Sequence, residues 1–238
     1  MTEYEGYMPY SYGVDNVETL NEIFRKVYQY MAIGLILTAL TAYITASSPR
    51  ILYMLFSSRA TFIILAVAEV GLVIALGAMI NKISSSMAFI MFAIYSILNG
   101  LTCSVILLVY TRASVYQAFF STAAMFGGMS LYGLYTKRDL TSMGSFLRMG
   151  LWGLLIAMII NIFVGSSMME LTISVLGIII FLGLTAYDTA KIKEMSYSYD
   201  TSEGNITGKI AVIGALTLYL DFINIFLYML RLFGKHRD

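Results

Sequence analysis

Seven apolar runs, each close to the roughly 20 residues that an α-helix needs to cross a bilayer, are the strongest constraint on the fold of this chain. They cover residues 27–47, 59–80, 86–110, 115–135, 146–164, 170–189 and 209–232. Backbone polar groups in hydrocarbon must be satisfied within their own segment, so such runs form helices. The runs predict an all-α integral membrane protein with seven transmembrane helices, a polar N-terminal tail (1–26) and a basic C-terminal tail (234–238).

The composition excludes several other classes of protein. Charged residues make up 12% of the chain and hydrophobic residues 59%, whereas roughly a quarter of a soluble domain is charged. The formal net charge of +1 and the lack of a basic cluster give no reason to expect nucleic acid as a partner. The single cysteine, Cys103, and the single histidine, His236, exclude an intramolecular disulfide and a paired-histidine zinc motif. We therefore expect no cofactor.

The basic residues predict the orientation in the membrane. Most of them lie in or beside the connections on the side of the N-terminus: Arg25, Lys26, Lys82, Lys137, Arg138, Arg148, Lys191, Lys193 and Lys209. Seven spans put fewer on the other side: Arg50, Arg59, Arg112, Arg231, Lys235 and Arg237. This asymmetry predicts a cytoplasmic N-terminus. A six-span form with a re-entrant last segment and both ends inside stays open. Seven spans are preferred, because the last run is long enough to cross the membrane.

The connections and the glycines add three local expectations. The apolar segment 51–56 either extends the second helix or lies in the membrane interface. The segment 191–208 is the only sizeable hydrophilic connection. Small residues allow transmembrane helices to approach closely. We expect this role for Gly127, Gly128, Gly150 and Gly153.

Asp221 lies in the middle of the last apolar run. A charged side chain at the centre of a membrane helix costs about 2.5–3.5 kcal/mol, so such an acid is a functional-site hypothesis by default. Thr217, Asp221, Asn224 and Tyr228 are spaced four, three and four residues apart, which places them on one stripe of a helix. This stripe is predicted to face protein or water and to line a pore or cavity, with the Leu, Ile and Phe residues toward lipid.

Two more acids, Glu69 and Asp188, fall within predicted spans. A rise of 1.5 Å per residue puts Asp221 about 18 Å along its helix from Lys209, a depth that allows contact with Asp188 without requiring it. Two carboxylates in contact at low dielectric cannot both stay ionised, so they would share a proton and form a pH-dependent latch. The alternative is that each aspartate is neutral and separately hydrogen-bonded. Glu69 either lines the same cavity or hydrogen-bonds a neighbouring helix as a neutral acid.

Three segments resemble the transmembrane Bax inhibitor motif family, also called the Bax inhibitor-1 family, in its prokaryotic form. They are FGGMSLYGLYTKRDLTSMGSFLRMGLWGLLIAMIINIF (126–163), AYDTAKIKEM (186–195) and ALTLYLDFINIFLYMLRLFG (215–234). They occur in the family's order, and the resemblance covers nearly the whole chain from the first helix onward. It implies a fold in which six helices wrap around a central C-terminal helix.

The resemblance also implies a function, a pH-sensitive leak of cations, chiefly Ca²⁺, with H⁺ as the regulator. Its gate and pH sensor would be a di-aspartyl pair that maps onto Asp188 and Asp221, and the family's helix-two acid maps onto Glu69. Similar prokaryotic proteins place an Arg near the inner end of helix two, where this chain has Ile80, so Lys82 is the nearest substitute for a latch cation. Two carboxylates fall short of the about six to eight oxygens that Ca²⁺ prefers, so only transient Ca²⁺ binding is expected at the pair.

Two rival functions use the same residues. An intramembrane aspartyl protease also needs two aspartates on neighbouring helices, and Tyr187-Asp188 matches half of that pattern. The other half fails, because Leu218-Tyr219-Leu220 precedes Asp221 in place of Gly-x-Gly, so no enzyme is predicted. The second rival is an interaction protein that modulates a membrane protease or a stress or cell-death pathway, with acids that serve only structure. Its partners would be the lipid bilayer and another membrane protein.

Overall fold

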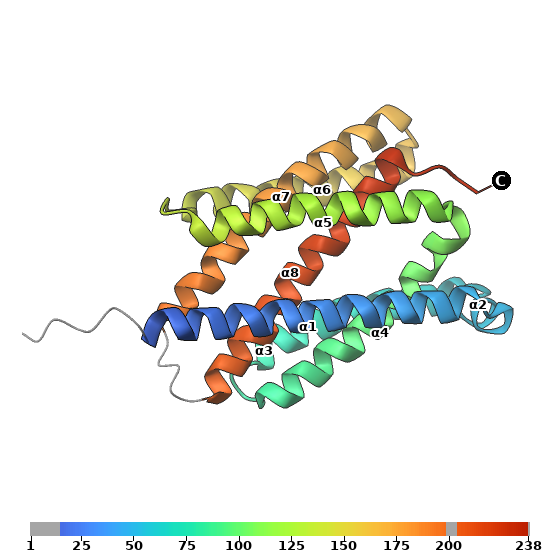
Figure 1. The fold of residues 1–238 in the computed structure, drawn as a ribbon. Helices are drawn as coiled ribbons and strands as arrows, with labels where there is room; N and C mark the ends of the chain where they lie inside the picture. Colours follow the sequence, from blue (N-terminus) through green and yellow to red (C-terminus); the bar gives the residue numbers. More distant parts are fainter. Residues whose placement is uncertain (1–14, 199–203, 238) are drawn as a thin grey trace, which may run out of the picture.

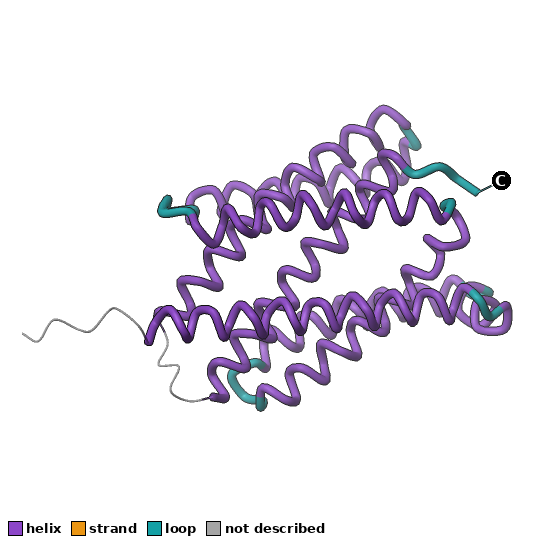
Figure 2. Tube along the Cα trace, in the orientation of Figure 1, coloured by secondary structure: helices purple, strands orange, loops and turns teal. Residues whose placement is uncertain are grey.

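The computed structural model describes residues 15–198 and 204–237, and within them the chain is helical with no β-strand (Figure 2). The helices are α1 (Asp15–Ala46), α2 (Pro49–Phe56), α3 (Arg59–Met79), α4 (Ser85–Val109), α5 (Arg112–Tyr135), α6 (Thr141–Val164), α7 (Ser167–Ser198) and α8 (Gly204–Phe233). The predicted all-α class is confirmed.

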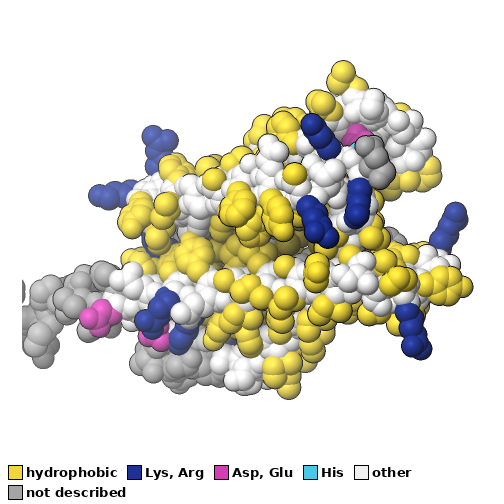
Figure 3. All heavy atoms as spheres, turned by 45° about the vertical axis from the view of Figure 1, so that its right-hand side comes forward, with side chains coloured by type: hydrophobic (Ala, Val, Ile, Leu, Met, Phe, Trp, Pro, Cys, Tyr) yellow, Lys and Arg dark blue, Asp and Glu magenta, His cyan; other side chains and the backbone are white. Residues whose placement is uncertain are grey.

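Six of these helices, α1, α3, α4, α6, α7 and α8, are long and apolar enough to cross a membrane by length and composition. Large hydrophobic side chains cover much of the outer surface between the two ends of the bundle (Figure 3). The helix α5 has the same length as α6 but is interrupted by polar side chains such as Gln117, Ser121 and Thr122, and it is not among the six. The seventh span therefore stays a prediction.

Two helices continue beyond the predicted apolar runs. The helix α1 begins at Asp15, so residues 15–26, predicted as a polar tail, are helical. The Lys26 ammonium pairs with the Glu22 carboxylate at 2.7 Å on this part of α1, an i,i+4 pair that supports a helix in water. The helix α7 runs on to Ser198 through residues predicted as a loop. Hydropathy marks only the part of a helix that hydrocarbon surrounds.

The short apolar segment after the first span forms a helix of its own, α2. Pro49 lies in its first turn, where the missing N–H costs nothing, and Ser57 and Ser58 separate it from α3. None of its residues is buried. The segment therefore does not extend α3, and its placement in the membrane interface stays a prediction.

The last helix, α8, is the most buried of the six. In its most apolar window 72% of the residues are buried, against 12% in α3 and 11% in α6. It packs against α1, α4, α5 and α7, and it crosses between a group formed by α5–α7 and a group formed by α1–α4 (Figure 1). The expectation that its Leu, Ile and Phe residues face lipid is wrong, because Leu218, Phe222 and Ile225 are buried between neighbouring helices. A ring of six helices around α8 stays a prediction.

The C-terminal residues fold back onto the connection between α4 and α5. The Thr111 N–H donates to the Lys235 carbonyl at 3.0 Å, and the His236 ring stacks on Tyr110 with centroids 5.1 Å apart. This attachment holds the end of α8 at the opposite end of the bundle from the start of α1 (Figure 1). A re-entrant last segment is not seen, since α8 is one continuous helix between these two ends.

Candidate functional site

The packing of α7 against α8 brings Asp188 and Asp221 into one cluster. Asp221 is buried with 4% of its surface exposed, and Asp188 is partly buried. The two carboxyl groups are close enough for the charge of Asp188 to act on Asp221. Sequence depth alone left this proximity open, and the structure supplies it.

The Asp221 carboxyl is incompletely hydrogen-bonded. The Thr185 side chain hydrogen-bonds to it, but the other oxygen, Oδ2, is buried and has no hydrogen-bond partner among the described residues. The Thr185 hydroxyl also donates to the Phe181 carbonyl at 2.8 Å, so its single proton is shared between two acceptors. A full negative charge on Asp221 would lack the hydrogen bonds that a buried carboxylate needs.

Two cations lie near Asp188 that the sequence did not single out as site residues. Lys191, three residues further along α7, and Arg148 of α6 are the charges that act on Asp188. The Arg148 guanidinium also lies over the Tyr187 ring, 5.5 Å from its centroid. Helical spacing could have identified Lys191, but nothing in the sequence pairs Arg148 with Asp188. The predicted latch cation, Lys82, is exposed in the turn after α3 and makes no ion pair within the described part of the chain.

Hydroxyl groups extend the polar cluster toward α1 and α5. Tyr28 of α1 hydrogen-bonds to Ser130 of α5, and Ser130 bonds to the Thr189 hydroxyl of α7 at 3.0 Å. Thr189, next to Asp188 in sequence, donates in turn to the Thr185 carbonyl at 2.7 Å. These buried hydroxyls link three helices beside the aspartates, a role that no sequence pattern indicated.

Glu69 belongs to a different cluster. It accepts a hydrogen bond from the Thr102 hydroxyl of α4, and the Asn99 side chain also bonds to it. Asn99 Oδ1 accepts from the Tyr219 hydroxyl of α8 at 3.0 Å, and that hydroxyl pairs with Thr38 of α1 at 2.6 Å. Of the two roles left open for Glu69, the geometry matches the acid that hydrogen-bonds a neighbouring helix.

The other residues of the predicted stripe are satisfied away from the aspartates. The Thr217 hydroxyl donates to the Ile213 carbonyl at 3.0 Å, and Asn224 Nδ2 donates to the Leu220 carbonyl at 2.8 Å, both within α8. The Tyr228 hydroxyl, also on α8, lies 3.6 Å from a methionine sulfur of α6. The structure brings only Asp221 of this stripe to Asp188, and a pore-lining role for the other three stays a prediction.

The described residues contain no group of three or more His, Cys, Asp or Glu side chains that could hold a metal ion. The aspartate pair offers two carboxylates, and Ca²⁺ prefers about six to eight oxygen ligands. The two carboxylates alone supply fewer oxygens than Ca²⁺ prefers, and transient Ca²⁺ binding there stays a prediction.

Comparison with known proteins shows what kind of membrane protein this is. The sequence model of the family described as "Inhibitor of apoptosis-promoting Bax1" matches residues 20–238. The inner membrane protein YbhL of Escherichia coli is 45% identical over 218 residues, covering 92% of this chain and 93% of that protein. An uncharacterized protein of Borreliella burgdorferi is 44% identical over 218 residues, covering 92% and 94%. The protein YrjE of Lactococcus lactis is 39% identical over 217 residues, covering 90% and 91%. With these matches and its membrane-length helices, the chain belongs to the Bax inhibitor-1 family of integral membrane proteins, as a member of the prokaryotic type.

Proposed function

We propose that this protein is a pH-sensitive calcium leak channel of the bacterial cytoplasmic membrane, gated by Asp188 and Asp221. One observation carries the proposal. Two acids from neighbouring helices lie in a single cluster, and one of them is buried with an oxygen that has no hydrogen-bond partner among the described residues. Intramembrane acids are costly and mark ion pathways and proton relays.

The gate works by the sharing of one proton. Lys191 and Arg148 stabilise one negative charge at Asp188, while no cation is found to act on Asp221 among the described groups. When the shared proton leaves, two like charges at ~4 Å repel by about 4 kcal/mol at an effective dielectric of 20. A repulsion of this size shifts a balanced two-state equilibrium strongly toward the state in which α7 and α8 separate at this point.

The proposal includes seven spans with the N-terminus in the cytoplasm. The helix α5 connects α4 to α6 and packs against α7 and α8. As the seventh span, it would direct its polar side chains toward these neighbouring helices. Nine of the 15 Lys and Arg residues belong to the end of the bundle where α1 begins, which favours that end as the cytoplasmic one. The name of the E. coli relative, an inner membrane protein, supports the cytoplasmic membrane as the location.

The direct test is Ca²⁺ flux into liposomes that contain the purified protein, measured over a pH series. The wild type is expected to show a flux that changes with pH, and Asp188→Asn and Asp221→Asn are each expected to remove that dependence. Glu170→Gln is the matched control, because Glu170 is an acid at the opposite end of α7, and it should behave like the wild type. Flux that is absent, or insensitive to pH and to both aspartate substitutions, would overturn the proposal.

The second candidate is a membrane interaction protein that modulates a membrane protease or a stress or cell-death pathway. The family description, which names inhibition of an apoptosis-promoting protein, favours it. In that case the aspartates serve structure alone, and the liposomes show no Ca²⁺ flux. None of the three relatives carries an enzyme's name, and we propose no enzymatic activity.

A further inference from the structure

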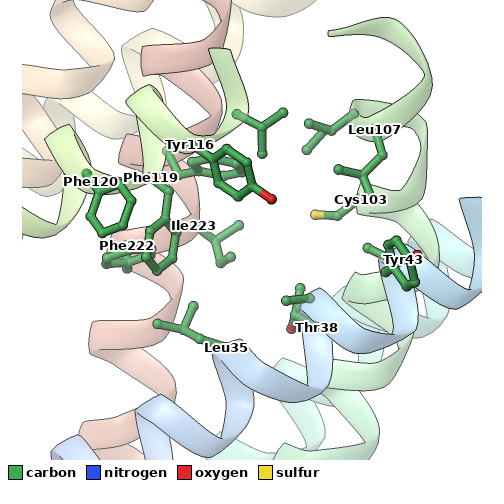
Figure 4. Close-up of a pocket in the computed structure, with 15 residues that line it drawn as sticks. Leu35, Thr38, Tyr43, Cys103, Leu107, Tyr116, Phe119, Phe120, Phe222 and Ile223 are labelled. Carbon is green, nitrogen blue, oxygen red and sulfur yellow. The ribbon is translucent and has the colours of Figure 1, made fainter. Parts of the chain in front are cut away.

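A cavity of about 420 Å³ lies between α1, α4, α5 and α8 (Figure 4). Its walls are formed mainly by apolar side chains, among them Leu35, Ile106, Phe119, Phe222 and Phe226. The space-filling view shows a hollow lined with hydrophobic side chains between the two halves of the molecule (Figure 3). The helices α1 and α5 border the cavity and make no extensive contact with each other in the described structure. The gap between the membrane-facing helices α1 and α5 therefore forms one side of the cavity.

Apart from the hydroxyls of Tyr43 and Tyr116, the polar side chains of the wall are already bonded within the protein. The Thr38 hydroxyl lies 2.9 Å from both the Gly34 and Ser96 carbonyls, and Cys103 Sγ lies 3.5 Å from Asn99 Oδ1. A buried water needs two to four polar partners, and most of this wall offers none. The cavity fits hydrocarbon and does not fit a hydrated ion.

A second cavity, of about 370 Å³, continues the first toward the α4–α5 end of the bundle. The two cavities share Tyr43, Leu107, Val115 and Tyr116, so they form one groove. The second part is lined by two guanidinium groups, those of Arg112 and Arg237. The groove thus has an apolar half and a cationic half.

The C-terminal segment fixes the position of Arg237, one of these two cations. The Arg237 N–H donates to the Val109 carbonyl at 2.8 Å, and the Lys235 N–H donates to Ser114 Oγ at 2.9 Å. These bonds hold Arg237 beside Arg112, although the two residues are far apart in the sequence. Neither guanidinium forms an ion pair with any residue that the structure describes. Two adjacent unpaired cations favour an anionic ligand.

We propose that this groove binds one anionic phospholipid, with an acyl chain in the apolar half and the phosphate between Arg112 and Arg237. Guanidinium groups match phosphate oxygens bidentately, and basic pockets between membrane helices bind anionic headgroups. An empty cavity would forfeit dispersion contacts that an acyl chain restores. A partner helix, about 10 Å across, does not fit a groove of this volume, which lies in the range of roughly 300–1,000 Å³ typical of small-ligand sites.

Retained lipid can be counted by native mass spectrometry after the full-length protein is equilibrated with equal amounts of phosphatidylglycerol and phosphatidylcholine of identical acyl chains. Wild-type protein is expected to retain phosphatidylglycerol roughly 30-fold over phosphatidylcholine, the preference that two arginines near an anionic headgroup provide. The double variant Arg112→Gln/Arg237→Gln should lose most of this preference. Arg59→Gln is the matched control, since Arg59 is an exposed arginine at the same end outside both cavities, and it should keep the preference.

A second variant tests the apolar half. Ala39 lines the cavity from α1 and is exposed, so Ala39→Phe fills the space without overpacking the core. It should reduce the retention of both lipids with Arg112 and Arg237 intact. Equal retention of the two lipids by the wild type, or an unchanged preference in the double arginine variant, would overturn the proposal. The wild-type comparison decides by itself if a variant fails to fold.

Discussion

Asp221 and Glu69 are both acids within membrane-length helices, yet their surroundings differ. The Asp221 carboxyl has an oxygen with no partner in the described structure and a second carboxylate nearby, whereas Glu69 accepts from Thr102 and bonds to Asn99. A satisfied acid stabilises the bundle, and an unsatisfied one stores free energy that a change of conformation can release. At the scale of single residues, this difference favours the aspartate pair as the gate and Glu69 as structure.

Substitutions of Glu69 test that assignment. Glu69→Gln keeps an acceptor for Thr102 and is expected to leave the pH dependence of Ca²⁺ flux unchanged. Glu69→Leu leaves the Thr102 hydroxyl and the Asn99 amide without this partner, which should lower the free energy of unfolding by about 1–3 kcal/mol. Denaturation followed by tryptophan fluorescence or circular dichroism measures the loss. A pH response that disappears in Glu69→Gln would place Glu69 in the gate.

Asp139, in the connection between α5 and α6, makes its own pH-dependent contribution to the stability of the fold. Its carboxylate accepts the Thr141 N–H at 2.8 Å, and the hydrogen bonds from the Thr141 side chain and backbone lower its pKa below the ordinary value of 3.8. Because this pKa is lower in the folded state than in the unfolded state, ionised Asp139 stabilises the fold at pH values above its unfolded-state pKa. This stabilisation is lost as the pH falls through the folded-state pKa. Asp139→Ala should therefore lower Tm slightly at pH 7, by about 2 °C or less, and not at all near pH 2. An equal loss of Tm at both pH values would contradict this account.

At the scale of helices, the close approach of α5 to α7 depends on Gly133. A Cβ at Gly133 would collide with the backbone of Ala186, two residues before Asp188, whereas a Cβ at Gly128 of the same helix meets nothing within 4 Å. Gly133→Ala should push α7 away and destabilise the protein by about 1–3 kcal/mol. Gly128→Ala is the matched control and should be neutral or slightly stabilising. Equal unfolding midpoints for the two variants would contradict this packing.

The sequence predicted where the helices lie better than it predicted which of their faces pack together. Hydropathy located the membrane-length helices to within a few residues at their apolar ends, because hydrocarbon requires a continuous apolar surface. It missed the polar extensions of α1 and α7, which water can surround. The expectation that Gly127, Gly128 and Gly153 allow close packing is wrong, since an added Cβ at each meets nothing within 4 Å. Which face of a helix meets a neighbour depends on tertiary contacts that one sequence does not contain.

At the scale of the whole molecule, the two ends of the bundle carry different chemistry. Lys191 and Arg148 act on Asp188 in the C-terminal part of α7, and Arg112 and Arg237 line the groove where α5 begins and α8 finishes. The sequence singled out both aspartates as candidates, because intramembrane acids are rare. It did not identify Arg148, Thr185 or the groove, since these depend on helices that meet only after folding.

We propose that Asp188 and Asp221 act as one proton-sharing unit. The most direct test measures the pH dependence of Ca²⁺ flux in liposomes for the wild type, Asp188→Asn, Asp221→Asn and the double variant. Residues that act as a unit are non-additive, so each single variant should lose the pH dependence as completely as the double variant does. Effects of the single variants that add up in the double variant, or a wild-type flux that does not change with pH, would contradict the claim.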